Sequence, residues 1–136
     1  MPKIKILIVD DDKLLCSTIQ KLLEGEGYVV DVAHRASEAM QMIPSGGFRL
    51  VLLDIFLPDE TGVAVLKRIK NHDGMIQVIM MTAHSKLQYV LECLEHGAFD
   101  YLLKPFEDPQ EIIDSVADTV KRLQKWEAAL RGKKDR

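Results

Sequence analysis

The strongest constraint on the fold of this chain is the regular alternation of short apolar runs with segments of helical periodicity. The runs cover 4–9, 28–33, 51–53, 78–81 and 101–103, and the first of them is rich in β-branched residues. Between successive runs, and after the last, apolar residues recur at the three- and four-residue spacing of an amphipathic helix. Five strand–helix units in strict alternation predict an α/β fold, a doubly wound parallel sheet of five strands with helices on both faces.

Charged and hydroxyl side chains stand where the predicted strands end. They are Asp10, Asp11 and Asp12 after the first run, Asp54 after the third, Thr82 after the fourth and Lys104 after the fifth. In an open parallel sheet, ligands bind beyond the carboxyl ends of the strands, where the strand order reverses. In a flavodoxin-like three-layer sandwich of order 2-1-3-4-5, the first and third strands are neighbours, and 28–33 is an edge strand. We therefore expect Asp10, Asp11 and Asp54 to converge on one small pocket.

The expected pocket suits a divalent cation and phosphoryl transfer. Clustered carboxylates raise one another's pKa unless a cation is present, and a set of oxygen ligands alone favours Mg²⁺. Lys104 and Thr82 would neutralise and hydrogen-bond the phosphoryl oxygens while an aspartate oxygen attacks in line. Asp54 follows a buried strand and suits the attacking role, whereas Asp10 and Asp11 lie at the turn into the first helix and suit metal binding.

Four segments together resemble one known family. They read ILIVDDD over 6–12, LLDIFLPDETG over 52–62, MMTA over 80–83 and GAFDYLLKPF over 97–106. In this order and spacing they resemble the receiver domain of two-component response regulators, and the resemblance covers about residues 3–120. It implies that Asp54 is the phospho-acceptor. It also implies that Asp11, Asp54 and the backbone carbonyl of Phe56 bind Mg²⁺, with Asp10 binding through water.

The resemblance assigns the remaining site residues as well. Thr82 and Lys104 would hold the phosphoryl group, Tyr101 would be an aromatic switch, and the peptide bond between Lys104 and Pro105 would be cis. Phe56 and His84 occupy two further positions, which in receivers adjust the rate at which the acyl phosphate is hydrolysed. We expect the bulky Phe56 to hinder the attacking water and to lengthen the phosphorylated lifetime.

These assignments imply a phosphorylation-operated signalling switch that catalyses only its own phosphorylation and dephosphorylation. A sensor histidine kinase or a phosphotransfer protein would donate the phosphoryl group to Asp54. The new charge would draw Thr82, Tyr101 would fill the space that is freed, and the surface of the fourth helix, fifth strand and fifth helix would change.

Other functions fit the fold less well. An aspartate-nucleophile phosphatase would need a second carboxylate where Phe56 stands. A flavin mononucleotide carrier would need a phosphate-binding loop rich in Ser, Thr and Gly where the aspartate run 10–12 stands. A receiver domain used only for binding would lack one or more of the site residues, and here all of them are present. A stand-alone receiver remains open, although the N-terminal receiver of a longer regulator is favoured by the length of the last helix.

The last predicted helix is longer than its domain requires. After Pro109, no Gly or Pro occurs as far as Arg131, whereas a helix of about 12 residues would be enough to cover a strand. We divide the chain into a receiver domain over 1–121 and an extension over 122–136, which would serve as a linker or a dimerisation segment. Residues 121–136 hold seven basic side chains and two acidic ones, while the whole chain has a net charge of -3. Without a recognition motif, contact with nucleic acid is expected only through an output domain.

Composition excludes several other classes of protein. The chain has 136 residues, of which 47% are hydrophobic and 29% charged, as expected for one globular domain with its own core. No apolar run approaches the roughly 20 residues of a membrane span, and the N-terminus lacks the features of a signal peptide, so we expect a cytoplasmic protein. Asp12 is expected to cap the first helix, and three histidines, His34, His72 and His96, are expected to be solvated.

Overall fold

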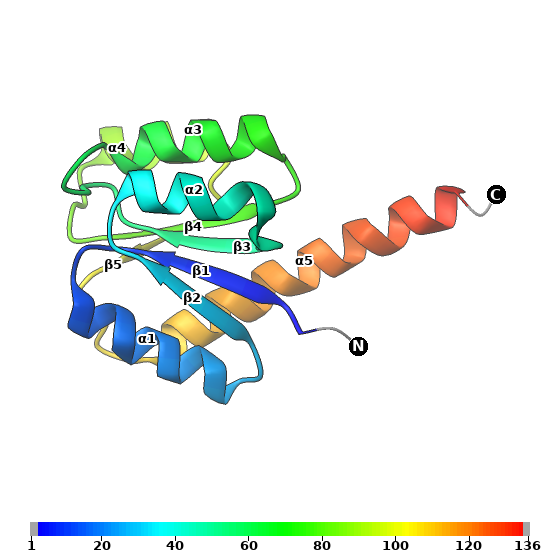
Figure 1. The fold of residues 1–136 in the computed structure, drawn as a ribbon, viewed down its shortest axis with the longest axis horizontal. Coiled ribbons are helices and arrows are strands. Elements are labelled where there is room, and N and C mark those ends of the chain that lie inside the picture. Colours follow the sequence, from blue (N-terminus) through cyan, green and yellow to red (C-terminus); the bar gives the residue numbers. More distant parts are fainter. Residues whose placement is uncertain (1–2, 135–136) are drawn as a thin grey trace.

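The computed structural model describes residues 3–134 and shows a parallel sheet between two layers of helices (Figure 1). The strands are β1 (Lys5–Val9), β2 (Val29–Ala33), β3 (Leu50–Leu53), β4 (Gln77–Thr82) and β5 (Asp100–Leu103). The helices are α1 (Lys13–Gly25), α2 (Ala36–Gly46), α3 (Gly62–His72), α4 (Leu87–Glu95) and α5 (Gln110–Lys134). Neighbouring strands pair in parallel in the order β2-β1-β3-β4-β5. The predicted fold class and strand order are confirmed.

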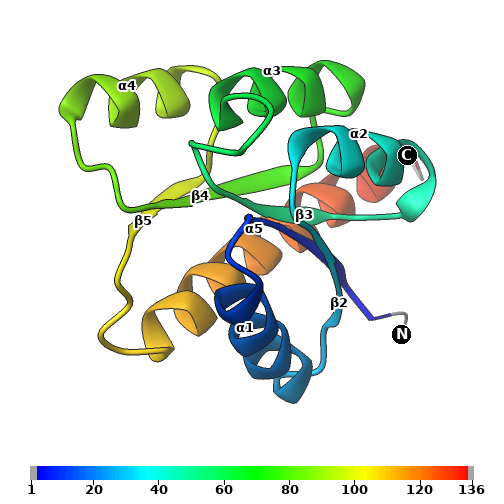
Figure 2. The ribbon, with the colours of Figure 1, turned by 60° about the vertical axis from the view of Figure 1, so that its left-hand side comes forward.

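Each face of the sheet has its own hydrophobic core. Helices α2, α3 and α4 cover one face, and α1 and α5 cover the other (Figure 2). Within β1, Leu7 and Val9 face the first layer, while Ile6 and Ile8 face the second. Because successive side chains of a strand point to opposite faces, a strand covered on both sides is apolar at every position. This explains the continuous apolar runs of the sequence.

Burial distinguishes the central strands from the edge strands. Every residue of β3 and β4 is buried, whereas β2 and β5 contain exposed or half-buried residues. The edge strand β2 is covered in part by α1, since the Gln20 side chain donates to the Val30 carbonyl oxygen at 2.8 Å. The three central strands β1, β3 and β4 therefore form a rigid base for the residues that follow them.

Helix α5 extends well beyond the sheet (Figure 1). It has 25 residues, about 37 Å at 1.5 Å per residue. Its packing on the domain continues past residue 121: Leu123 is fully buried, and Arg49 Nη2 lies 2.9 Å from Glu127 Oε1. Arg122 stacks between the rings of Phe99 and Trp126, with its guanidinium carbon 5.3 and 5.0 Å from the ring centres. Asp135 and Arg136, the last residues of the predicted extension, lie outside the described residues.

None of the helices formed by residues 3–134 combines the length and the apolar character needed to cross a membrane. Helix α5 is long enough, but charged side chains occur throughout its length.

Candidate active site

Three carboxylates meet at the carboxyl end of the sheet, as the strand order predicts. Asp10 follows β1 and Asp54 follows the adjacent β3, where the Asp54 N–H donates to the Val9 carbonyl oxygen at 3.0 Å. One oxygen from each of Asp10, Asp11 and Asp54 lies within 4.8 Å of the others. Asp10 and Asp54 are buried, whereas Asp11 is exposed. The prediction that these three side chains converge on one pocket agrees with this placement.

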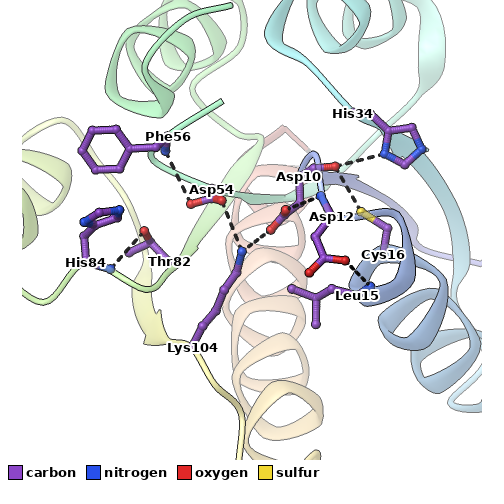
Figure 3. Close-up of polar contacts among 10 residues, drawn as sticks. All are labelled: Asp10, Asp12, Leu15, Cys16, His34, Asp54, Phe56, Thr82, His84 and Lys104. Atoms are coloured by element: carbon purple, nitrogen blue, oxygen red, sulfur yellow. Dashed lines mark hydrogen bonds and ion pairs between the residues drawn. The ribbon is translucent and has the colours of Figure 1, made fainter. Parts of the chain in front are cut away.

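Lys104 reaches into the carboxylate cluster from the end of β5. Its ammonium group forms an ion pair with Asp10 Oδ2 and lies 3.2 Å from Asp54 Oδ2 (Figure 3). Burial raises the pKa of Asp10, although Lys104 counters the effect. Burial also opposes the charge of Lys104, but the hydrogen bond with Asp10 and the charge of Asp54 outweigh it and hold the pKa of Lys104 above its usual value. The peptide bond that follows Lys104 is cis.

The loop after Asp54 is held close to the start of α3 by a glycine. The Gly62 N–H donates to the Ile55 carbonyl oxygen, and a Cβ atom on Gly62 would overlap the backbone of Asp54. Only glycine therefore fits at this position without moving the phospho-acceptor candidate. Thr61 caps α3 through its hydroxyl oxygen, which accepts a hydrogen bond from the Ala64 N–H at 3.3 Å.

Thr82 ends β4 next to the strand that carries Lys104. Its side chain is fully buried, and its Oγ1 accepts a hydrogen bond from the His84 N–H at 3.3 Å. The Lys104 N–H donates to the Thr82 carbonyl oxygen at 2.8 Å. Among residues 3–134, no hydrogen bond joins the Thr82 hydroxyl to the carboxylates. Thr82 is thus adjacent to the cluster, and its contact with a phosphoryl group remains a prediction.

An aromatic cluster stands beside Asp54 on the side of α4. The Phe56 N–H is 3.5 Å from Asp54 Oδ1, and the Phe56 ring is 40% exposed. The centre of this ring lies 4.1 Å from that of His84 and 5.5 Å from that of Tyr89. The Tyr101 hydroxyl donates to the His84 carbonyl oxygen, and burial raises the pKa of Tyr101 to about 12. The loop after Thr82 is therefore tied to both Phe56 and the predicted switch residue.

Some residues at this end of the sheet have contacts that the sequence did not indicate. The expectation that His34 is solvated is wrong: this residue is half-buried, and its Nδ1 lies 3.0 Å from the Asp10 carbonyl oxygen. Asp59 caps α2 from another loop, since its carboxylate accepts from the Ala36 and Ser37 N–H groups at 2.9 and 3.0 Å. The only available signal for His34 was its position directly after β2. Asp12 caps α1 as predicted, accepting from the Leu15 N–H at 3.0 Å.

The oxygen atoms of the cluster fit a magnesium ion. All three side-chain donors are hard carboxylate oxygens, which Mg²⁺ prefers, and the exposed Asp11 leaves the cluster open to the water molecules that Mg²⁺ retains. No other group of three or more carboxylate, imidazole or thiol side chains gathers as closely within residues 3–134. The arrangement combines a buried carboxylate, a cluster of oxygen atoms that could hold a cation and an ammonium group, and phosphoryl transfer to a side chain needs groups of these three kinds.

Comparison with known proteins shows the family to which the chain belongs. The family model of the response regulator receiver domain matches residues 6–117. The uncharacterized transcriptional regulatory protein YkoG of Bacillus subtilis is 40% identical over 107 residues, which are 79% of this chain and 47% of YkoG. The transcriptional regulatory protein ZraR of Escherichia coli is 41% identical over 104 residues, which are 76% of this chain and 24% of ZraR. The chain thus spans from a quarter to a half of the length of these curated relatives.

Solved structures show the same fold. The crystal structure of a CheY-like response regulator receiver domain protein from Methanospirillum hungatei superposes with a TM-score of 0.88 at 31% sequence identity. This similarity covers 91% of the present chain and 98% of the other.

Proposed function

Because the chain belongs to the response regulator receiver domain family, we propose that it is a signalling switch in which Asp54 accepts a phosphoryl group from phosphohistidine. The donor is a sensor histidine kinase or a phosphotransfer protein. The observation that carries the proposal is the position of the Lys104 ammonium group between the Asp10 and Asp54 carboxylates. That arrangement places a fixed positive charge beside the nucleophile, where negative charge develops during phosphoryl transfer.

Each site residue has a defined task in the transfer. An Asp54 carboxylate oxygen attacks phosphorus, the new phosphorus–oxygen bond forms, and the phosphorus–nitrogen bond of the donor breaks as its imidazole leaves. Lys104 neutralises the transferred oxygens, and the Thr82 hydroxyl donates to one of them. Asp11, Asp54 and the Phe56 carbonyl oxygen would hold Mg²⁺, with Asp10 acting through water, and the ion would supply positive charge that neutralises the transferred group.

An apolar groove beside the reacting groups would receive the phosphodonor. A groove of about 520 Å³ lies between α1 and the loop that precedes α5. Its lining is mostly apolar, includes Leu15, Leu22 and Phe106, and ends at Lys104. A donor helix with apolar residues around its phosphohistidine would bury them here while the phosphoryl group faces Asp54.

The switch connects Asp54 to the α4–β5–α5 surface through the loop after Thr82. When the Thr82 hydroxyl moves to the phosphoryl group, it gives up the hydrogen bond from the His84 N–H. The same loop holds the Tyr101 hydroxyl through the His84 carbonyl oxygen. Movement of one loop therefore reaches both the aromatic cluster and β5.

The output lies on the apolar surface of α4, β5 and α5, and dimerisation is its most direct form. Exposed large apolar side chains on this surface are Leu87, Leu91, Leu94 and Leu103, and those on the α5 extension are Trp126 and Leu130. We place the receiver domain at 1–121 and a linker or dimerisation segment at 122–136, with Leu123 and Glu127 packed on the domain. An output domain beyond this segment would make any contact with nucleic acid, and the whole regulator would act in the cytoplasm.

The chemistry is limited to the phosphoryl group of the protein itself. A phosphatase with turnover would need a general acid two residues after the nucleophile, and Phe56 has no proton to give. The chain would therefore catalyse only its own phosphorylation and dephosphorylation.

Intact mass spectrometry tests the proposal directly. The parent protein and Asp54→Asn are incubated with acetyl phosphate, each with MgCl₂ and with EDTA. A single labile phosphoryl group on the parent with MgCl₂, absent from the other three samples, is the expected result. Phosphorylation of Asp54→Asn to the same extent would contradict the assigned acceptor. Light scattering of the same samples tests dimerisation, and a monomer in both states at high concentration would exclude it.

A further inference from the structure

The carbonyl oxygen of Asp10 is held by two side chains to which the phosphoryl chemistry gives no role. His34 Nδ1 lies 3.0 Å from this oxygen, and Cys16 Sγ lies 3.3 Å from it (Figure 3). A carbonyl oxygen carries no proton, so the first contact requires a proton on His34 Nδ1. Burial raises the pKa of Cys16 to about 12, so this thiol keeps its proton and donates as well. Both donors therefore point at one backbone atom of the acidic cluster.

We infer that His34 is a positioning residue for the metal-binding carboxylates, because it fixes the peptide plane between Asp10 and Asp11. The inference rests on the proposed function. The carbonyl group of Asp10 and the N–H group of Asp11 belong to one rigid planar unit. A hydrogen bond that orients the Asp10 carbonyl therefore also sets the backbone angles from which the side chains of both residues project.

The two carboxylates differ in how much they depend on this backbone anchor. Asp10 is fully buried, and its Oδ1 accepts from the Asp12 N–H at 2.9 Å while its Oδ2 pairs with Lys104. Asp11 is exposed, so neighbouring side chains restrict it less and its direction depends mainly on the backbone. We therefore expect the anchor to act on metal binding chiefly through Asp11.

His34 is itself attached to the start of α2, which the loop after Asp54 holds in turn. Its N–H donates to Glu38 Oε1 at 2.7 Å. Shortly after His34 in the chain, Ala36 and Ser37 donate hydrogen bonds from their N–H groups to the Asp59 carboxylate. Asp59 lies in the loop that starts at Asp54, so side-chain to backbone bonds connect the segment 34–37 with both loops that supply the carboxylates of the cation site. Such preorganisation restricts ligand motion before the cation binds.

Amide chemical-shift titration of the full chain with MgCl₂ tests the inference without any phosphorylation. His34→Phe keeps a planar ring but loses the donor, and it should weaken Mg²⁺ binding by about three- to tenfold, the range expected for one lost hydrogen bond. His34→Asn places an amide N–H near the position of Nδ1 and should restore most of the affinity. His72→Phe, at an exposed position at the end of α3, serves as the matched control and should bind as the parent does. The Asp11 amide resonance should move in His34→Phe before any Mg²⁺ is added.

Each outcome decides between the possible roles of His34. Equal Mg²⁺ affinity in the parent and in His34→Phe would overturn the inference and leave the proposed function intact. Equal weakening in His34→Phe and His34→Asn would assign the effect to lost packing and would also overturn it. A parent protein that does not bind Mg²⁺ would remove the proposed cation site and this inference with it. If His34→Phe does not fold, as judged by circular dichroism, the comparison of His34→Ala with His34→Asn replaces it.

Discussion

Replacing Lys104 with methionine should destabilise the protein by an amount that depends on magnesium. Its ammonium group is 3.2 Å from Asp54 Oδ2 and also pairs with the fully buried Asp10. At an effective dielectric constant of about 20, unit charges 3.2 Å apart interact by about 5 kcal/mol. Burying the lysine, whose side chain is 17% exposed, costs part of this energy, so we expect the free energy of unfolding to fall by about 3 kcal/mol without metal.

Magnesium should offset most of that loss. Without the lysine, the carboxylates have no competing cation within the site, so Lys104→Met should bind Mg²⁺ more tightly than the parent does. Both proteins gain stability from bound Mg²⁺, so at saturation the difference between them shrinks by the free energy that corresponds to the ratio of their dissociation constants. We expect the variant to bind Mg²⁺ about thirtyfold more tightly, which would shrink the difference by about 2 kcal/mol, to about 1 kcal/mol.

Urea unfolding followed by circular dichroism, in EDTA and in saturating MgCl₂, measures both quantities. Lys70→Met is the matched control, because Lys70 is also half-buried but donates to the carbonyl oxygens of Gly74 and Ile76, both at 2.8 Å. That variant should lose stability equally in both buffers. A loss in Lys104→Met that is the same with and without Mg²⁺ would refute the view that the lysine neutralises the cation site in the metal-free protein.

The pH dependence provides a second check on the same cluster. Burial raises the pKa of Asp10, so the folded protein binds this proton more tightly than the unfolded chain does. Between the raised value and the ordinary 3.8, the contribution of Asp10 to stability grows as the pH falls and is lost as the pH rises. In Lys104→Met without metal, the same slope should be steeper, because the positive charge that favours the ionised carboxylate is gone.

Three further predictions concern other parts of the molecule. Phe56→Ala should shorten the lifetime of the phosphorylated protein several-fold, which equals about 1 kcal/mol in the barrier to hydrolysis, because the phenyl ring that keeps water from the acyl phosphate is gone. A longer lifetime in the variant, measured by the release of phosphate, would contradict this. Leu123→Ala should lower the free energy of unfolding in urea by about 3 kcal/mol, whereas Leu130→Ala, at a 54% exposed position, should change it by less than about 0.5 kcal/mol. Equal losses of stability in these two variants would show that the packing of α5 on the domain extends to Leu130. Hydrogen bonds from two backbone N–H groups of α2 hold the pKa of Asp59 below 3.8, so the contribution of Asp59 to the stability of the fold is present above that pH and is lost as the pH falls through the lowered value. Asp59→Asn should remove this part of the acid dependence of stability, as measured by urea unfolding at several pH values. An unchanged pH profile in the variant would count against it.

The sequence was sufficient for the fold because its two periodicities alternate without ambiguity. The apolar runs are short, and the carboxyl ends of parallel strands must share one edge of the sheet. The convergence of Asp10, Asp11 and Asp54 follows from this topology, because β1 and β3 are neighbours. The same topology puts Thr82 and Lys104 at the ends of the adjacent strands β4 and β5.

Contacts that depend on loop conformation could not be predicted in this way. Asp59 reaches α2 only because the loop after Asp54 folds back toward it, and no periodicity encodes that path. The pair formed by Arg49 and Glu127 joins residues far apart in the chain, and it depends on the angle at which α5 crosses the sheet. A division of the chain by helix length alone places Leu123 in the extension, although this residue is fully buried against the domain.

The anchors of Asp10 explain how the site can exchange partners without losing its shape. In the proposed switch, an acyl phosphate on Asp54 would carry roughly 1.5 to 2 negative charges where the carboxylate carried one, and the Lys104 ammonium group has three N–H donors to share. If Lys104 turns toward the phosphoryl oxygens, Asp10, which is fully buried, would lose part of its ion pair. The hydrogen bonds from the Asp12 N–H to its carboxylate and from His34 to its carbonyl oxygen do not involve the lysine. These bonds would keep Asp10 in place through the proposed transfer, so that only the loops that carry the signal would need to move.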